Sequence, residues 1–309
     1  MTTTAVASAP AATTRGAGTP TRSRRRSAVW VGLLPFLAYV VIFLAVPAVL
    51  AVASGFFDSK GVFTFANLKA LTSPQILNQF LASFGVSLVT AVIGAVVGAI
   101  ICFALMGTKP DGVLRTVVDS ASSVLAQFGG VMLAFAFIAL IGTQGLLTQT
   151  LVHAGWAQNP LNHFGNNGTL LYQVPGLVIP YLYFQVPLMV LTFMPAMEGL
   201  KATWGEANAT LGGTRFTYWT RIAMPILAPA FFGSVILLFA NSFSSYATAA
   251  ALISQGGIIP LAIKQATSSE TVIGIANVAG VLALGMVIVM VILMSAYGLL
   301  QRRAARWQR

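Results

Sequence analysis

Two long stretches of this chain, residues 120–197 and residues 222–263, contain no Asp, Glu, Lys or Arg. Within them and beside them lie apolar runs of about 20 residues or more, the length that a helix needs to cross the hydrocarbon core of a bilayer. Only 7% of the 309 residues are charged and 57% are apolar, whereas roughly a quarter of the residues of a soluble globular domain are charged. These features restrict the chain to a polytopic membrane protein.

Six segments are long and apolar enough to span the membrane. They are residues 29–54, 80–106, 119–141, 171–197, 226–252 and 273–300. We therefore predict an all-α transmembrane domain over residues 28–301, with a disordered cytoplasmic tail over residues 1–27 and a basic cytoplasmic tail over residues 302–309. Prolines in the fourth span predict a kink, and small residues in the second span predict close helix packing. Those small residues are Gly85, Ser87, Thr90, Gly94, Ala95, Gly98 and Ala99.

The distribution of positive charge predicts the orientation of the chain. With both termini in the cytoplasm, fourteen of the seventeen Lys and Arg residues are cytoplasmic, and only Lys60, Lys69 and Lys264 lie outside. Cytoplasmic loops of membrane proteins carry an excess of Lys and Arg, so this orientation is favoured. The cations flank apolar runs and form no basic face, so the formal charge of +11 does not indicate a nucleic-acid partner.

The loop over residues 198–225 joins the fourth and fifth spans and is polar and basic. Two short helices joined at Gly212 and Gly213 fit this loop, because glycine suits the left-handed position after a helix end and the tight turn that follows. The spacing of Thr203 and Glu206 predicts a capping box at the start of the first helix. From the residues alone, an amphipathic segment lying on lipid headgroups explains the loop equally well.

The same loop resembles the EAA loop of ABC-importer permeases, whose usual pattern is EAA, three residues, Gly, nine residues, and then I-x-L-P. The matching positions are Glu206, Ala207, Gly212, Ile222 and Pro225, with Asn208 in place of the second alanine and Met224 in place of the leucine. In that family this loop holds a coupling helix, here residues 202–211, which docks on an ATPase and passes its closure to the membrane bundle as a rigid-body tilt. The resemblance covers residues 28–309 and implies the type I permease fold.

This resemblance also implies the partners of the chain. It implies a multi-pass protein of the bacterial plasma membrane that forms half of a translocation pathway. The other parts are a second, paralogous permease subunit, two cytoplasmic ATPase subunits and an extracytoplasmic solute-binding protein, all surrounded by membrane lipid. ATP and Mg are used by the ATPase, because this chain has no G-x-x-x-x-G-K-[ST] phosphate loop. We assign no catalytic residue, no metal site and no bound cofactor to the chain itself.

A second segment, residues 241–265, resembles the F-x-x-F/Y-x-T-P-x-L-x-G-G stretch of the permease subgroup that serves polyamines, ferric ions and phosphonates. The matching positions are Phe243, Tyr246, Thr248, Leu252, Gly256 and Gly257, and Ala249 stands where proline is common. The subgroup implies uptake of a small polar solute of one of these kinds. A sugar-type importer is the alternative.

The polar residues at the end of the fifth span have two interpretations. Asn241, Ser245, Tyr246 and Thr248 are candidates for lining the translocation pathway, but hydrogen bonds between helices explain the same cluster. No span contains an acidic residue near its middle. An intramembrane site for a polycation is expected to contain one, so either an external binding protein selects the solute or the solute is not a simple polycation.

Functions of other classes fit the sequence less well. An intramembrane enzyme or a proton-coupled carrier needs a titratable group at depth, and the spans contain no His, Asp or Glu there. A secondary carrier or a channel has no use for a cytoplasmic coupling loop. The sequence therefore favours a transport subunit that is not an enzyme.

Overall fold

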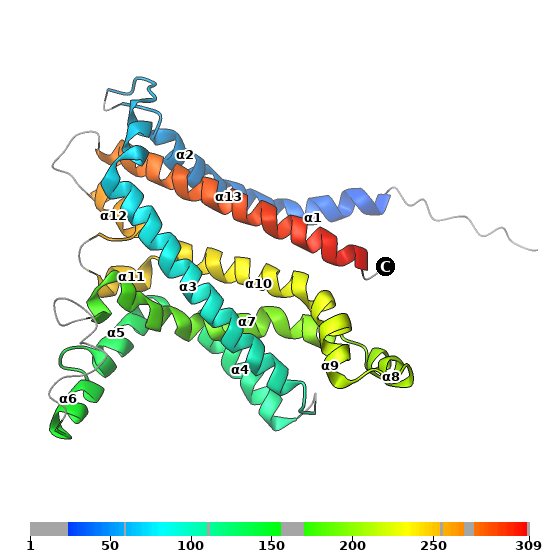
Figure 1. Cartoon of the computed structure of the whole chain (residues 1–309). Coiled ribbons are helices and arrows are strands. Elements are labelled where there is room, and N and C mark those ends of the chain that lie inside the picture. Colours follow the sequence, from blue (N-terminus) through cyan, green and yellow to red (C-terminus); the bar gives the residue numbers. More distant parts are fainter. Residues whose placement is uncertain are drawn as a thin grey trace, which may run out of the picture. The chain divides into compact units, whose positions relative to one another are not determined.

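The computed structural model of the chain is almost entirely helical (Figure 1). It describes residues 24–58, 60–109, 112–155, 170–253, 256–268 and 275–307. The described residues contain no strand beyond an isolated bridge between Phe57 and Phe63, so the predicted all-α class is confirmed. Most of the predicted N-terminal tail lies outside the described residues.

The chain divides into two units, Met1–Leu50 and Ala51–Arg309. The first unit contains α1 (Arg24–Val40), a π-helical turn (Val41–Ala45) and the first part of α2 (Val46–Ser54). The longer helices of the second unit are α3 (Pro74–Leu105), α4 (Val113–Gln127), α5 (Gly130–Ile141), α7 (Val178–Glu198), α10 (Met224–Ser244) and α13 (Ile275–Trp307). Its shorter helices are α6 (Leu146–His153), α8 (Ala202–Thr210), α9 (Arg215–Tyr218), α11 (Ala247–Leu252) and α12 (Ile259–Ser268).

Six helical stretches of the described chain have the length and composition of membrane spans. They are Gly32–Ser54, Pro74–Leu105, Gly130–His153, Val174–Glu198, Arg215–Leu252 and Asn277–Leu300. The predicted number of spans is therefore confirmed. The last helix, α13, continues to Trp307, so residues 302–307 of the predicted basic tail are helical.

The third and fifth predicted spans are not single helices. Residues 119–141 are divided between α4 and α5, because the chain leaves the helical conformation at Phe128 and Gly129 and Gly130 has a φ of +74°. The fifth span breaks after Ser244, and α11 forms a separate short helix. The fourth predicted span begins with two 3-10 turns, Leu170–Tyr172 and Val174–Leu177, and α7 then stays one helix through Pro187 and Pro195.

Small residues of α3 bring this helix close to α7, as the sequence predicts. A β-carbon added to Gly94 would lie 2.9 Å from the β-carbon of Gln185, and one added to Gly98 would lie 2.5 Å from that of Met189. The two contacts are one helical turn apart on both helices, so the backbones approach along a continuous face. Gly85 differs, because it has open space around the position of a β-carbon.

Two π-helical turns precede prolines in the same way. The turn Val41–Ala45 ends two residues before Pro47, and the turn Trp219–Ala223 ends two residues before Pro225. In each case the residue just before the proline donates its N–H to the carbonyl five residues earlier. A proline ring clashes with the carbonyl four residues before it, and the wider turn relieves this clash.

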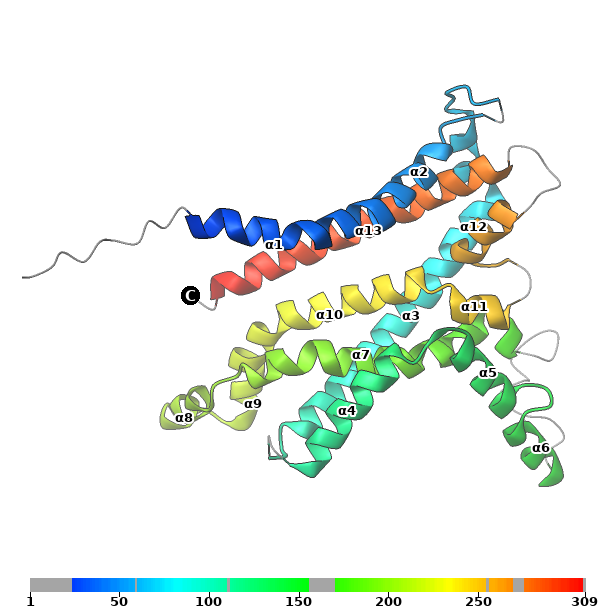
Figure 2. The same ribbon diagram turned by 180° about the vertical axis from the view of Figure 1, so that it is seen from behind.

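The two ends of the second unit carry different features (Figures 1 and 2). The short helices α8 and α9 lie at one end, and α11 and α12 lie at the other. The C-terminal part of α13 lies toward the α8 end, where a β-carbon on Gly233 of α10 would come within 3.0 Å of the Tyr297 ring. The predicted coupling loop and the predicted pathway residues therefore occupy opposite ends of the bundle.

Candidate functional site

The turn between α8 and α9 has the geometry that its two glycines predict. Gly212 follows the helix with a φ of +76°. Its N–H donates to the carbonyl of Ala209 at 3.0 Å, and the N–H of Gly213 donates to the carbonyl of Asn208 at 2.8 Å. These two bonds form a Schellman motif, which closes the last carbonyls of α8 and fixes the direction of the chain. We call residues 202–218 the α8–α9 hairpin.

The second glycine of this turn is required because there is no room for a side chain at its position. A β-carbon on Gly213 would collide with the side chain of Asn208. That side chain is buried and donates from Nδ2 to the carbonyl of Thr214 at 3.1 Å, so it joins α8 to the start of α9. Asn208 stands where the motif of the resembled family has alanine, and in this chain it stabilises the hairpin.

The predicted capping box at Thr203 and Glu206 is wrong. The first helix of the hairpin begins two residues earlier than this box requires, at Ala202, with Lys201 at the N-cap and no side-chain capping bond. The side chain that caps a helix here is Thr214, whose hydroxyl accepts from the N–H of Thr217 at 3.3 Å at the start of α9. Only three residues separate the end of α7 from the start of α8, so Thr203 already lies inside the helix.

The outer surface of the hairpin is available to a partner. Glu206 and Ala207 are exposed. Two large apolar side chains are exposed beside them, Leu211 to 88% and Phe216 to 77%. Apolar residues in such positions typically mark an interaction surface. The motif does not include Leu211 or Phe216, and the only signal for them in the sequence is their apolar character within a polar loop.

The last two motif residues belong to the return into the membrane bundle. Ile222 is half-buried in the π-helical turn, and Pro225 lies in the first turn of α10. The neighbouring Trp219 packs edge-on against Phe103 of α3, with 5.0 Å between ring centroids. Trp219 also lines a groove of about 510 Å³ between α3, α7 and α10 whose lining residues are all apolar, so this groove does not suit a polar solute.

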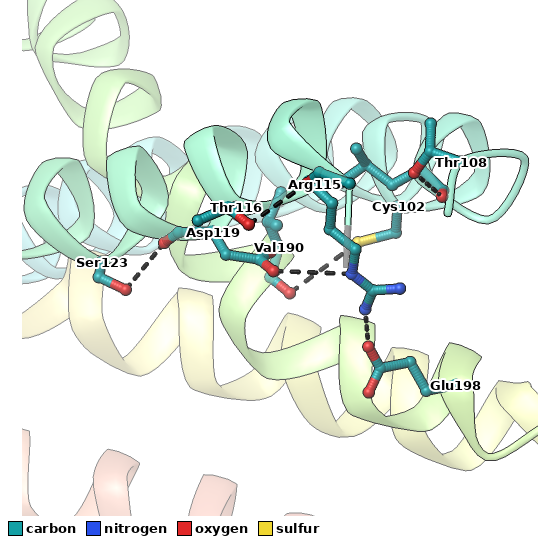
Figure 3. Close-up of polar contacts among 10 residues, drawn as sticks. Cys102, Thr108, Arg115, Thr116, Asp119, Ser123, Val190 and Glu198 are labelled. Carbon is teal, nitrogen blue, oxygen red and sulfur yellow. Dashed lines mark hydrogen bonds and ion pairs between the residues drawn. The ribbon is translucent and has the colours of Figure 1, made fainter. Parts of the chain in front are cut away.

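An ion cluster with one buried member, Arg115, lies beside the start of the hairpin (Figure 3). Arg115 of α4 is 8% exposed, and its guanidinium forms an ion pair with Glu198, the last residue of α7. Its Nε also lies 3.6 Å from Oδ2 of Asp119, one turn further along α4. Only the folded chain brings Glu198 to Arg115, and the four-residue spacing of Arg115 and Asp119 gave the only sequence signal.

At the other end of the unit, the predicted pathway residues divide into two groups. Asn241 and Tyr246 are exposed and Ser245 is half-buried. Thr248 is buried, and its hydroxyl lies within hydrogen-bond distance of both the N–H and the carbonyl of Gly130. The position of Thr248 therefore matches the alternative of a hydrogen bond between helices, while pathway lining stays a prediction for the other three.

At the break after α10, a backbone carbonyl is hydrogen-bonded by a side chain from another helix. The hydroxyl of Tyr181 on α7 donates to the carbonyl of Ser245 at 3.0 Å. Non-helical backbone within a membrane protein persists only where its polar groups find partners inside the protein. Near this break, the Nζ of Lys264 on α12 lies 6.0 Å from the centroid of the Tyr246 ring, so a cation stands beside an exposed candidate pathway residue.

Sequence comparison finds relatives over a limited part of the chain. It is 31% identical over 71 residues to the sulfate transport system permease protein CysT of Escherichia coli and to the protein of the same name from Salmonella typhimurium. These matches cover 23% of this chain and 26% of each relative, so they span about a quarter of the relatives' length. No family model matches the chain.

Comparison with solved structures covers nearly the whole chain. A bacterial alginate ABC transporter in complex with an alginate-bound periplasmic protein aligns with a TM-score of 0.68 at 15% identity, over 91% of this chain and 96% of that one. A bacterial ABC transporter that imports alginate aligns with a TM-score of 0.67 at 16% identity, over 90% and 96%. The MetNI methionine ABC transporter in an inward-facing conformation aligns with a TM-score of 0.54 at 15% identity, over 74% and 96%. The chain therefore has the fold found in these ABC importers, as the resemblance implied.

Proposed function

We propose that this chain is the transmembrane permease subunit of a binding-protein-dependent ABC importer, and that ATP hydrolysis by partner subunits drives its movement. The observation that carries this proposal is the α8–α9 hairpin. Its Schellman turn at Gly212 occupies the glycine position of the EAA motif. The hairpin lies at one end of a bundle that shares its fold with solved ABC importers.

The surface of the hairpin supports an ATPase as its partner. A helix that transmits force needs a rigid connection to the next helix. The Asn208 side chain joins α8 to the start of α9, and Gly212 forms the tight turn between them. It also needs a contact surface, and Leu211 and Phe216 are exposed on it. The excess of Lys and Arg in the loops and tails on the same predicted side of the membrane supports a cytoplasmic position for the hairpin. A second permease chain and an extracytoplasmic binding protein complete the proposed assembly.

We further propose that the solute is a small oxyanion of the phosphonate or sulfate class. Two observations support this choice. The matching relatives are named for sulfate. The titratable residue beside Tyr246 is a cation, Lys264, and the described spans hold no carboxylate near their middle. An intramembrane site for a polyamine or a ferric ion would favour a carboxylate, so an oxyanion fits these residues better.

Orientation can be tested by cysteine labelling, because the chain has a single native cysteine, Cys102, which is buried. Thr210→Cys on the hairpin should react with a membrane-impermeant maleimide in inverted vesicles and stay unlabelled in spheroplasts. Lys264→Cys should show the opposite pattern. Labelling of Thr210→Cys from the outside would refute a cytoplasmic coupling loop.

The function itself is tested by purification and transport. A complex purified through a tag on this chain should contain an ATPase and a second permease, and in proteoliposomes its ATP hydrolysis should be stimulated by a binding protein loaded with solute. Uptake of radiolabelled sulfate or methylphosphonate in excess of putrescine supports the oxyanion proposal. A complex without an ATPase subunit contradicts the importer proposal, and a preference for putrescine contradicts only the choice of solute.

A further inference from the structure

The position of Arg115 is unfavourable by itself. It is the third residue of α4, so its positive charge lies in the first turn, where the partial charge of the helix is also positive. Its side chain is buried as well, and a buried charge is costly without a partner. The N-terminus of α4 has no side-chain cap that could offset either effect.

Glu198 opposes its own helix dipole with the opposite sign, and its side chain is 50% exposed. It is the last residue of α7, where a negative charge meets the negative end of a helix. The α7 terminus has no basic residue in its last turn. Each of the two residues therefore opposes its own helix dipole, and their ion pair compensates both at once (Figure 3).

This ion pair lies at the junction with the hairpin. Only Gly199, Leu200 and Lys201 separate Glu198 from the start of α8. Leu200 packs against the apolar core, so the junction is held from the membrane side as well. Any displacement of α8 therefore reaches the end of α7 at the residue that is bound to α4.

The opposite end of α4 contains a break. The chain leaves the helix at Phe128 and Gly129, and the first residue of α5, Gly130, is bound through its backbone to Thr248 of α11. The helix α4 also packs along α7. It is thus attached at one end to the α7–α8 junction, and at the other end it meets a non-helical joint next to α11.

We propose that Arg115 is a positioning residue for coupling: it fixes the α7–α8 junction to α4, so that movement of the hairpin displaces α4 and α7 together and bending occurs at residues 128–129. This inference rests on the proposed function, because it assigns a path to the movement that an ATPase would impose. The pair ties one position of α4 to the end of α7, in addition to the packing between the two helices.

The decisive measurement is the amount of solute taken up per ATP hydrolysed by the assembled complex in proteoliposomes. Arg115→Met and Glu198→Gln should each lower this ratio by at least about fivefold, while the ATPase subunit remains bound. Asp119→Asn serves as the matched control, because Asp119 lies on the same helix as Arg115, with its Oδ2 3.6 Å from the Arg115 Nε. Its loss leaves the contact between α4 and α7 in place, so it should change the ratio by less than about twofold.

Reversing the charges provides the rescue. In Arg115→Glu/Glu198→Arg, each charge would suit its own helix end, but Glu at position 115 would face Asp119. The swap is therefore made together with Asp119→Asn and compared with Asp119→Asn alone. It should restore the uptake ratio to within about twofold of that control.

The outcomes separate the two proposals. A wild-type complex without an ATPase subunit overturns both the proposed function and this inference. A coupled wild type in which Glu198→Gln assembles and keeps a normal ratio overturns the role of Arg115 alone. If Arg115→Met fails to assemble, the uptake ratios of Glu198→Gln and of the charge swap test the role of the ion pair instead. An assembled swap that remains as uncoupled as the single variants also overturns the inference.

Discussion

The hydroxyl of Thr248 lies 3.0 Å from the backbone nitrogen of Gly130 and 3.2 Å from its carbonyl oxygen, so a single side chain serves both polar groups at the break between α4 and α5. The two residues are separated by 118 positions in the sequence. This contact joins two interrupted helices, because Thr248 itself lies in α11, just after the break that follows α10.

Removing this hydroxyl should destabilise the protein. Thr248→Val keeps the shape of the side chain but leaves the N–H of Gly130 without the partner that the structure shows, which should cost about 1–3 kcal/mol. In detergent, the apparent melting temperature should fall by roughly 2–6 °C. Thr267→Val is the matched control, because the Thr267 hydroxyl is exposed and bonds only to Ile263 in its own helix. Equal melting temperatures for the two variants would contradict the role of Thr248.

The contact of α3 with α7 should tolerate no side chain at Gly98. Gly98→Ala would place a methyl group 2.5 Å from the β-carbon of Met189, so the helices must separate, at a cost of roughly 1–3 kcal/mol. Gly85→Ala on the same helix has open space and should be neutral or slightly stabilising. Thermal unfolding of both variants in the same detergent checks this. A Gly98→Ala protein as stable as Gly85→Ala would show that the helices are not in close contact there.

The two glycines of the hairpin should respond differently to substitution. Gly212 has open space but a φ of +76°, so Gly212→Val should strain the turn by about 1–2 kcal/mol, whereas Gly212→Asn should be tolerated because Asn adopts this conformation more readily. Gly213→Ala should disturb the turn through its collision with Asn208. We expect Gly212→Val to insert normally and to lose stimulation of ATP hydrolysis by the loaded binding protein. Full stimulation in Gly212→Val would refute the need for this turn.

The exposed side chain of Leu211 should contribute strongly to ATPase binding. Central apolar contacts of an interface often contribute about 2 kcal/mol or more, so Leu211→Ala should weaken binding of the purified ATPase subunit by roughly 30-fold. Val62→Ala is the control, because Val62 is 62% exposed in the loop before α3, outside the hairpin. Binding can be measured by titrating the ATPase onto the permease complex in nanodiscs. Equal affinities would place the ATPase contact elsewhere.

Local features of the sequence were sufficient for much of the architecture. The number of spans, the all-α class, the hairpin and the left-handed Gly212 all follow from hydropathy and from backbone preferences within a few residues. The close contact at Gly94 and Gly98 was also predictable, because only small residues let two membrane helices approach. The capping box at Thr203 was wrong because the point where a helix starts depends on how the preceding helix ends.

Other features exist only in the folded chain. Hydropathy shows apolar length but cannot show where a helix stops, so the breaks at Phe128 and Ser245 became visible only with the partners that satisfy them, Thr248 and Tyr181. The pairing of Arg115 with Glu198 is likewise a matter of tertiary structure. Each residue alone opposes its helix dipole. Both positions are stabilised by the contact between these two residues, which lie 83 positions apart in the sequence. The sequence determined which segments enter the membrane, since transfer into lipid depends on composition. Tertiary structure decided how those segments are joined, because a buried polar group is stable only beside the partner that folding brings to it.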